Sequence, residues 1–358
     1  MMLVPGPVEL HPRVLKAMSE QVISHRSERF SALLSEITEG LNWAADGGEG
    51  SRVALLTGSG TLAVESMIYS IINPGDKVLS LEFGEFGRRM RESLEIRGAV
   101  VHTIKAAPGK TPTLDEIERT AEDFKPKYIA TVHVETSTGA IMKNLEGISK
   151  IAESIGSHVL LDAVSSFGGE ELRMEKWGIY AFASCSQKGL GAPPGLSFVI
   201  LSRDAVKRTC ETEKKPSYLD LCKSMKFLER RETPFTPAVN LMYGLAEALK
   251  LLREEGKERR WERIRRASEL LYRKAESLGY TPLPPEESRA HTIVALYPPR
   301  GLDAAKVIEE LRKRGIYVAA GMGELKGKIL RIGIMGYVEE HHIEKLVGEL
   351  ESIGRGAP

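Results

Sequence analysis

The regular alternation of short apolar runs with amphipathic stretches is the feature that most constrains how this chain folds. The apolar runs predict strands at 52–56, 77–81, 100–104, 128–132, 158–161, 181–184 and 197–201. Between the earlier ones lie predicted helices at 61–72, 86–97, 114–123 and 145–155. This order is typical of a mostly parallel α/β sheet with helices on both faces. Ligands of such sheets bind beyond the carboxyl ends of the strands, so we look for chemistry there.

The last third of the chain has a different pattern. A long charged stretch, 238–278, predicts helix, and its acids and bases interleave as on a solvated helix face. Strands at 291–297, 316–319 and 328–334 and helices at 304–314 and 339–353 then indicate a smaller α+β unit. A length of 358 residues fits two domains. We predict a large domain over 15–240 and a small one over 241–358, joined by the segment 1–14.

Charge and cysteine content exclude several classes of protein. Lys and Arg total 50 against 49 Asp and Glu, which argues against a protein that grips nucleic acid through bulk charge. No stretch approaches the roughly 20 apolar residues of a membrane span, and no signal peptide precedes residue 15, so we expect a cytoplasmic protein. Cys185, Cys210 and Cys222 form no CxxC pair. Neither a disulfide framework nor a metal site is indicated.

The sequence TGSGT at residues 57–61 lies between a predicted strand and a predicted helix. Glycines let the backbone approach an anion, and the helix N-terminus offers free N–H groups beside the hydroxyls of Ser59 and Thr61. No lysine follows as in a Walker A loop, and the third glycine of GxGxxG is missing. A plain strand-to-helix turn explains these residues equally well.

Two charged residues follow later strands. Asp162 ends the 158–161 run, where its carboxylate is placed either to pair with a cationic ligand group, such as a protonated pyridine nitrogen, or to cap a turn. Lys188 lies in SQKGLGAPPG, residues 186–195. A lysine among such small residues is either a partly desolvated Schiff-base former or a surface side chain on a turn.

Two further segments carry polar groups at strand positions. The sequence HVETSTG at 133–139 follows a strand and forms either the wall of a ligand cleft or a capped turn. Arg331 interrupts the apolar run 328–333. Its guanidinium either makes a structural ion pair or binds a carboxylate ligand.

Taken together, these segments resemble the class V pyridoxal-phosphate aminotransferases, most closely the alanine–glyoxylate, serine–glyoxylate and serine–pyruvate aminotransferases. The resemblance rests on VPGP at 4–7, SHRSERF at 24–30, SQK at 186–188 with APPG at 192–195, and LRIG at 330–333. It covers nearly the whole chain. It implies the fold type I architecture with a seven-stranded sheet, pyridoxal 5'-phosphate as cofactor, and a homodimer with its active site at the subunit interface.

The resemblance also implies roles for single residues. Lys188 is expected to bond covalently to the cofactor and to act as the catalytic base. Asp162 is expected to pair with the pyridine nitrogen, and Arg331 to clamp the substrate carboxylate near Gly6. The other expected cofactor contacts are Ser59, Gly60, Thr61 and Gln187 at the phosphate, Phe86 and Val164 on the ring faces, Thr136 near the ring oxygen, and Thr236 at the phosphate held by the partner subunit. Pro234 stands where several relatives carry a tyrosine that also contacts that phosphate.

The resemblance therefore predicts a transaminase that moves an amino group from alanine or serine to glyoxylate or pyruvate by a ping-pong mechanism. Small residues at the substrate end, among them Gly6 and Ala320, favour small donors. A phosphonate or phosphoserine aminotransferase stays open. A cysteine desulfurase-like lyase needs a late loop cysteine, and no cysteine follows Cys222. A non-enzymatic assembly module is disfavoured by Lys188, Asp162 and Arg331 together.

Overall fold

A seven-stranded sheet lies at the centre of the larger part of the molecule, in a computed structural model that describes residues 1–355. Its strand order is β1-β9-β8-β7-β4-β2-β3. The strand β9 runs antiparallel to β1 and β8, and the other pairs are parallel. The predicted fold class is confirmed. The strands are β1 (Arg52–Thr57), β2 (Lys77–Glu82), β3 (Val100–Lys105), β4 (Tyr128–Val132), β7 (His158–Asp162), β8 (Ile179–Cys185) and β9 (Leu196–Leu201).

Helices cover both faces of this sheet because successive strand residues point to opposite sides. Val159 and Leu161 of β7 pack into one core, and Leu160 between them packs into the other. The first core is completed by α1 (Pro12–Met18), α2 (Glu28–Ala44), α5 (Leu114–Phe124), α6 (Leu145–Ser154) and α9 (Val239–Glu255). The second is completed by α3 (Gly60–Ile71), α4 (Glu85–Arg97), α7 (Arg203–Glu211) and α8 (Leu221–Leu228).

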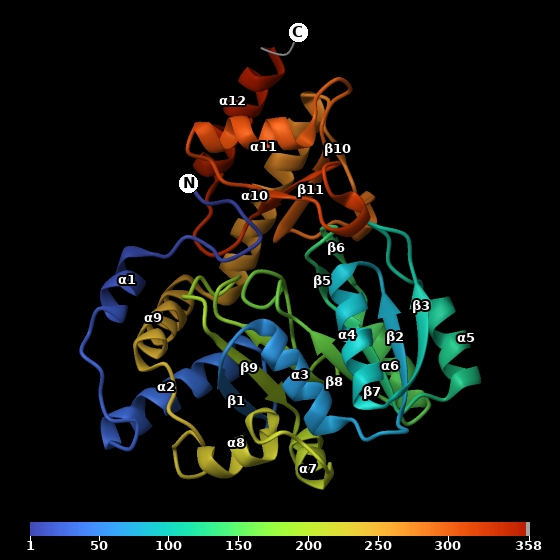
Figure 1. Ribbon diagram of the computed structural model, residues 1–358, viewed down its shortest axis with the longest axis vertical. Coiled ribbons are helices and arrows are strands. Elements are labelled where there is room, and N and C mark those ends of the chain that lie inside the picture. The colour runs from blue at the N-terminus through green and yellow to red at the C-terminus, as the bar shows by residue number, and fades with distance from the viewer. Residues whose placement is uncertain (356–358) are drawn as a thin grey trace.

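A second, four-stranded sheet has a core of its own and lies above the large sheet in Figure 1. Its order is β10-β11-β13-β12, and three helices pack against it. Three strands are shorter than predicted, since β11, β12 and β13 hold only residues 293–297, 319–320 and 330–333. The elements are β10 (Thr281–Pro282), β11 (Ile293–Tyr297), β12 (Ala319–Ala320), β13 (Leu330–Gly333), α10 (Lys257–Ser277), α11 (Ala304–Lys313) and α12 (Glu340–Arg355).

The charged stretch 238–278 is two helices rather than one. Gly256, with a φ of 85°, ends α9 and begins α10, because this left-handed conformation suits a residue without a Cβ. Along α10, Arg265 pairs with Glu262 and with Glu269 on the exposed surface. The solvated ion-pair face expected from the sequence is therefore confirmed.

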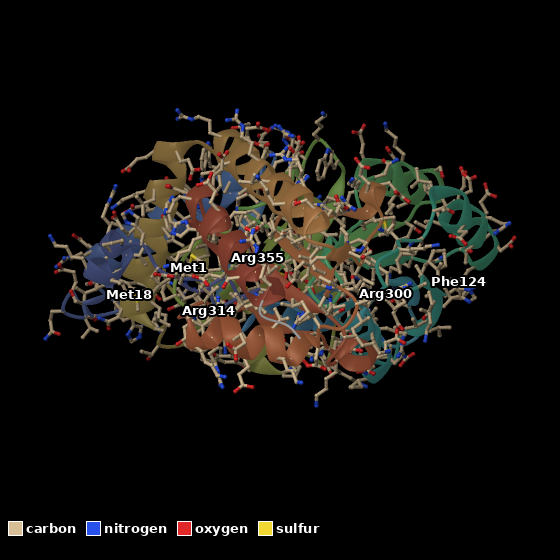
Figure 2. All side chains as sticks on the ribbon, turned by 90° about the horizontal axis from the view of Figure 1, so that it is seen from above. Met1, Met18, Phe124, Arg300, Arg314 and Arg355 are labelled. Carbon is tan, nitrogen blue, oxygen red and sulfur yellow. A yellow bond between two sulfur atoms is a disulfide. The ribbon has the colours of Figure 1, made fainter. Side chains whose placement is uncertain are left out.

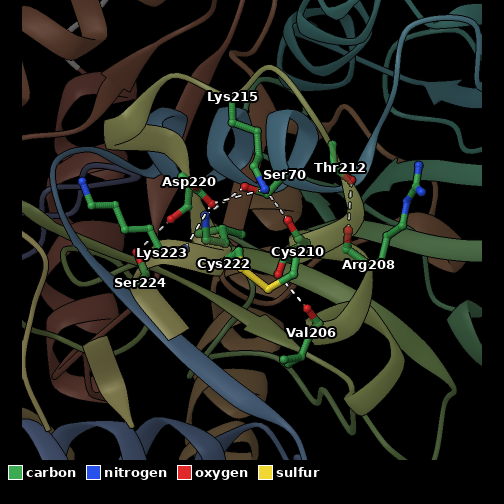
Figure 3. The surroundings of a disulfide bond; sticks show 12 residues. Ser70, Val206, Arg208, Cys210, Thr212, Lys215, Asp220, Cys222, Lys223 and Ser224 are labelled. Atoms are coloured by element: carbon green, nitrogen blue, oxygen red, sulfur yellow. Dashed lines mark hydrogen bonds and ion pairs between the residues drawn. A yellow bond between two sulfur atoms is a disulfide. The ribbon is translucent and has the colours of Figure 1, made fainter. Parts of the chain in front are cut away.

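The expectation that the cysteines form no disulfide is wrong for one pair. Cys210 of α7 and Cys222 of α8 are bonded, with 4.9 Å between their Cα atoms (Figure 3). The chain between them turns back through the short helix η1 (Ser217–Leu219), and Ser70 of α3 bonds both Leu219 O and the N–H of Leu221. A spacing of 12 residues carries no sign of this approach, because it depends on how the two helices dock.

The N-terminal segment links the two sheets. The N–H of Leu3 donates to Tyr317 O and that of Gly333 donates to Leu3 O, at 2.8 and 2.7 Å. The Met1 ammonium donates to Gly315 O, and Met1 and Arg314 lie close together when the molecule is seen from this end (Figure 2). Further along, the N–H of Val8 bonds Gln187 O in the large part. Among the helices of residues 1–355, none has the length and apolar character that crossing a bilayer requires.

Candidate active site

Lys188 is buried in the loop that follows β8. Its Nζ donates to Pro5 O at 2.6 Å and to Ser165 Oγ at 3.1 Å. Burial lowers the pKa of Lys188 below its ordinary value, because desolvation disfavours the ammonium. A lowered pKa increases the fraction of uncharged amine at neutral pH. The amine is the form that attacks carbonyl groups and accepts protons.

Asp162 is the last residue of β7, on the strand next to β8 in the sheet, and it is buried. Burial raises its pKa to about 6, although the N–H of Val164 donates to Asp162 Oδ1 at 2.9 Å. A carboxyl group in such a place favours a cationic partner, which restores the ionised form. The two residues predicted from separate motifs therefore lie at the ends of adjacent strands, as the parallel order requires.

Arg331 reaches from the small sheet to the turn after β5 (Val134–Glu135). Its Nη1 donates to Thr136 O and its Nε to Ala320 O, both at 2.8 Å. The side chain is buried, and desolvation lowers its pKa. Thr136 Oγ1 in turn lies 2.5 Å from Ser165 Oγ, the hydroxyl that contacts Lys188. The site therefore lies between the two sheets.

The N-terminus of α3 follows β1 at residues 57–61 and has the free N–H groups that an anion cradle requires. Ser59 occupies the N-cap position and its side chain makes no capping bond, so the first N–H groups keep their capacity for a ligand. A Cβ added to Gly60 would lie 2.8 Å from Val164 Cγ2, so the close approach of helix and loop requires glycine. The buried Oε1 of Gln187 has no partner among the described residues.

Phe86 and Gly6 come from two other segments of the chain, α4 and the N-terminal segment. Phe86 is half-buried in the first turn of α4, with the Arg89 guanidinium 4.9 Å from its ring centroid. Gly6, with a φ of 105°, passes directly over Lys188, because a Cβ there would lie 3.1 Å from Lys188 Cε. Only a glycine combines this φ with this contact.

Thr236 is not part of this buried group. It is exposed between α8 and α9, and it lines a surface pocket with Thr57, Tyr218 and Pro234. Thr57 immediately precedes the anion cradle. Thr236 is therefore open to another molecule rather than to the lysine of its own chain.

Two polar residues at the site were not singled out from the sequence. Ser165 contacts Lys188, and Glu135 is fully buried where β5 meets α4. Glu135 lies inside the segment 133–139, and Ser165 follows Asp162 by three residues. The sequence did carry one sign of Glu135. It is a glutamate in a short segment of small residues, which is an unusual place for an unpaired charge.

The described groups fit the cofactor expected from the sequence. An anion cradle, a buried amine and a buried carboxyl group match the phosphate, the aldehyde and the ring nitrogen of pyridoxal phosphate. Cys185, by contrast, is buried, and burial raises the pKa of its thiol to about 12, so it is unsuited to act as a nucleophile.

Comparison with known proteins agrees with this geometry. The family model Aminotransferase class-V matches residues 9–346. The chain is 32% identical to a protein named soluble hydrogenase, small subunit, of Synechococcus sp., over 99% of this chain and 92% of that protein. The crystal structure of alanine–glyoxylate aminotransferase from Nostoc sp. has a TM-score of 0.93 at 34% identity, covering 98% of this chain and 94% of that one.

A second solved structure is similar to the same extent. The aspartate aminotransferase of subgroup IV from Thermus thermophilus has a TM-score of 0.92 at 32% identity, covering 100% of this chain and 99% of that one. The family match spans most of the chain, and both structures are aminotransferases by name. The chain belongs to the class V aminotransferase family and is an aminotransferase that uses pyridoxal phosphate.

Proposed function

We propose that the protein transfers the amino group of a small amino acid, alanine or serine, to glyoxylate or pyruvate. The observation that carries this proposal is the continuous contact from Arg331 through Thr136 and Ser165 to Lys188. It supports the proposal because it connects a guanidinium, the group that binds carboxylates best, to a basic amine through two residues. The name of the Nostoc structure supports glyoxylate as acceptor, and the small side chains of Gly6 and Ala320 favour a small donor.

Pyridoxal phosphate supplies an electron sink for the negative charge that develops at the substrate Cα when its proton leaves. In this proposal Lys188 holds its aldehyde, Asp162 its ring nitrogen and Thr136 its ring oxygen. The N–H groups of the α3 N-terminus would bind the phosphate, and Phe86 and Val164 would hold the two faces of the ring. The remaining phosphate contacts are Ser59, Gly60, Thr61 and Gln187, with Thr236 serving the partner subunit.

Lys188 provides the proton transfer. Its lowered pKa keeps a useful fraction of the side chain as free amine, which removes the Cα proton of the substrate. The Ser165 hydroxyl and the Pro5 carbonyl hold the nitrogen in position between transfers. Asp162 keeps a proton on the pyridine nitrogen, because a buried carboxyl group is stabilised as an anion by a cation beside it.

Arg331 orients both substrates. Two backbone carbonyls fix its guanidinium through Nε and Nη1, and these bonds do not use the hydrogens of Nη2. The fixed fork binds the α-carboxylate that amino and keto acids share. One clamp then serves both half-reactions, which is consistent with ping-pong kinetics, in which the first keto acid leaves before the second binds.

A half-reaction screen tests the substrate proposal. The holoenzyme is mixed with one amino acid at a time, without keto acid, and the change in its visible absorbance is followed. Alanine or serine is expected to react fastest, and glyoxylate or pyruvate to reverse the change. Aspartate is included because of the Thermus thermophilus neighbour, and phosphoserine because of the alternative left open by the sequence. A reaction with either of these and not with alanine or serine would show that the proposed donor is wrong.

We further propose a homodimer with its active site at the interface. Tyr218 and Phe235 are 44% and 37% exposed, and their ring centroids lie 5.2 Å apart beside Thr236. Exposed aromatic pairs are typical of interfaces. Light scattering and a Thr236→Arg variant, which places a bulky cation there, test this proposal through loss of the dimer.

A cytoplasmic location and the domain division remain proposals. Separate cores under the two sheets support a division into a large domain, proposed over 15–240, and a small one, proposed over 241–358, although the core of the large sheet continues through α9 to Leu252. Cell fractionation tests the location, and limited proteolysis tests the boundary near residue 240.

A further inference from the structure

The first turn of α4 lacks a capping side chain of its own. Its N-cap residue is Gly84, and the carboxylate of Glu135, about 50 residues later, takes over that task. Glu135 Oε2 accepts from the N–H groups of Phe86 and Gly87, each at 3.0 Å. A Cβ on Gly84 would lie 2.3 Å from Glu135 Cγ, so the glycine leaves the space that the glutamate occupies.

The other oxygen of Glu135 is bound from its own turn. Oε1 accepts from the N–H of Ser137 at 3.0 Å and from Ser137 Oγ at 2.6 Å. Glu135 is 0% exposed, so four donors surround two oxygens without water. This arrangement demands two acceptor atoms and is stabilised by negative charge at the positive end of a helix dipole.

Glu135 and the next residue join three parts of the site. Glu135 fixes the helix turn that carries Phe86, and Thr136 O holds Arg331. Thr136 Oγ1 also contacts Ser165, which contacts Lys188. The turn therefore sets the position of α4 against the residues that surround the reacting atoms.

We propose that Glu135 is a positioning residue for pyridoxal phosphate: it anchors Phe86, and the Phe86 ring fixes the cofactor ring. This inference rests on the proposed function, which places Phe86 on the cofactor. Glu135 acts through the backbone of α4 and does not itself touch the reacting atoms.

A double-mutant cycle tests the inference. Glu135→Gln keeps the shape but replaces one acceptor oxygen by an NH₂ group that faces N–H donors. The dissociation constant of pyridoxal phosphate is measured by titrating the cofactor-free forms of wild type, E135Q, F86L and E135Q/F86L. Loss of a well-placed ring contact is expected to raise this dissociation constant about tenfold in E135Q and in F86L. When Phe86 is already replaced, adding E135Q is expected to raise the dissociation constant by less than about threefold, because the ring that Glu135 positions is absent. The visible circular dichroism of the bound cofactor changes in both single variants.

Glu170→Gln is the matched control. Glu170 is also buried and accepts from two backbone N–H groups, those of His291 and Thr292, but it lies away from α4. E170Q is expected to lower Tm as E135Q does and to leave the cofactor's circular dichroism unchanged. If E135Q does not fold, Glu135→Asp replaces it, because it retains both acceptor oxygens and is expected to bind more tightly than Glu135→Ala.

The outcomes separate the two proposals. Wild-type affinity in E135Q, or an undiminished effect of E135Q in the F86L background, would overturn the role of Glu135 while the proposed function stands. Equal spectral changes in E170Q and E135Q would reduce Glu135 to a structural role. A wild-type protein that binds no pyridoxal phosphate would overturn the proposed function and this inference together.

Discussion

Ser165 Oγ lies 3.1 Å from Lys188 Nζ and 2.5 Å from Thr136 Oγ1. One buried hydroxyl thus couples the amine after β8 to the turn after β5 that holds Arg331. The bond to the small sheet is made by Arg331 on Thr136 O, and the neighbouring Ser166 donates to Ala163 O instead of contacting the lysine.

Ser165→Ala is expected to lower the pKa of Lys188 further, because the ammonium loses an acceptor. Hydrogen bonds to charged groups contribute roughly 1.5–3 kcal/mol, so the decrease in the Lys188 pKa is large enough to measure. Reductive methylation of the cofactor-free protein across pH, read by mass spectrometry at Lys188, measures it. Ser166→Ala is the control. Equal methylation curves for the two variants would show that Ser165 does not hold the amine.

Lys188→Ala is expected to remove the covalent cofactor absorbance and to reduce kcat/KM by about 10⁴-fold, the upper range for a catalytic base. Absorbance spectra and steady-state kinetics measure the two effects. Cys185→Ser, three residues earlier, controls for disturbance of the loop. Normal absorbance and full activity in Lys188→Ala would contradict the assignment of the lysine.

Arg331→Lys is expected to raise KM for both amino and keto acids by about 10- to 100-fold, because a lysine cannot reproduce the two-point bond to a carboxylate. Initial rates at varied donor and at varied acceptor give the two values. A rise for one substrate alone would mean that the clamp is not shared between the half-reactions.

The raised pKa of Asp162 predicts a pH dependence in the cofactor-free protein. Its folded pKa of about 6 exceeds its ordinary value of 3.8, so ionisation is harder in the folded state. The folded protein therefore loses stability from this group as pH rises from 4 to 7, by about 3 kcal/mol, and loses nothing from it below pH 4. Asp162→Asn removes this dependence. Urea unfolding of both proteins across that range measures the difference between their free energies of unfolding. A difference that does not change with pH contradicts the prediction.

The bond between Cys210 and Cys222 is expected to stabilise the protein by about 3 kcal/mol, since it closes a loop of 12 residues in the unfolded chain. The double variant C210S/C222S, and wild type treated with a dithiol reductant, should unfold at lower urea with kcat unchanged. The reductant should have no effect on the double variant. Coincident unfolding curves for all samples would mean that the bond contributes no stability.

The elements of the large sheet were predictable because each apolar run is followed by a local end signal. Helix starts carry local signals too: Thr113 and Glu116 form a capping box at the start of α5. The disulfide was not predictable, because the approach of α7 to α8 is a tertiary contact, as is the docking of Leu219 and Leu221 on Ser70 of α3. The short strands β12 and β13 were overestimated, since apolar residues continue beyond the paired ones.

The residues of the candidate site that follow the ends of strands were predictable. Asp162 and Lys188 were found because a charge among buried or small residues is conspicuous. Glu135 was missed because its partners, the N–H groups of Phe86 and Gly87, lie on a helix 50 residues earlier. Backbone N–H groups are common to nearly all residues, so the sequence does not show which side chain accepts from them. Such acceptors are found only from coordinates.

The N-terminal segment has a consequence for biosynthesis. Pro5 O and Gly6 lie on Lys188, and Leu3 is held by Tyr317 and Gly333, which the ribosome adds more than 300 residues later. Residues 1–3 can therefore make these bonds only after the small sheet has been synthesised. Arg331 also lies in that sheet, so a nascent chain that ends before it has Lys188 and Asp162 but lacks the arginine that bonds Thr136.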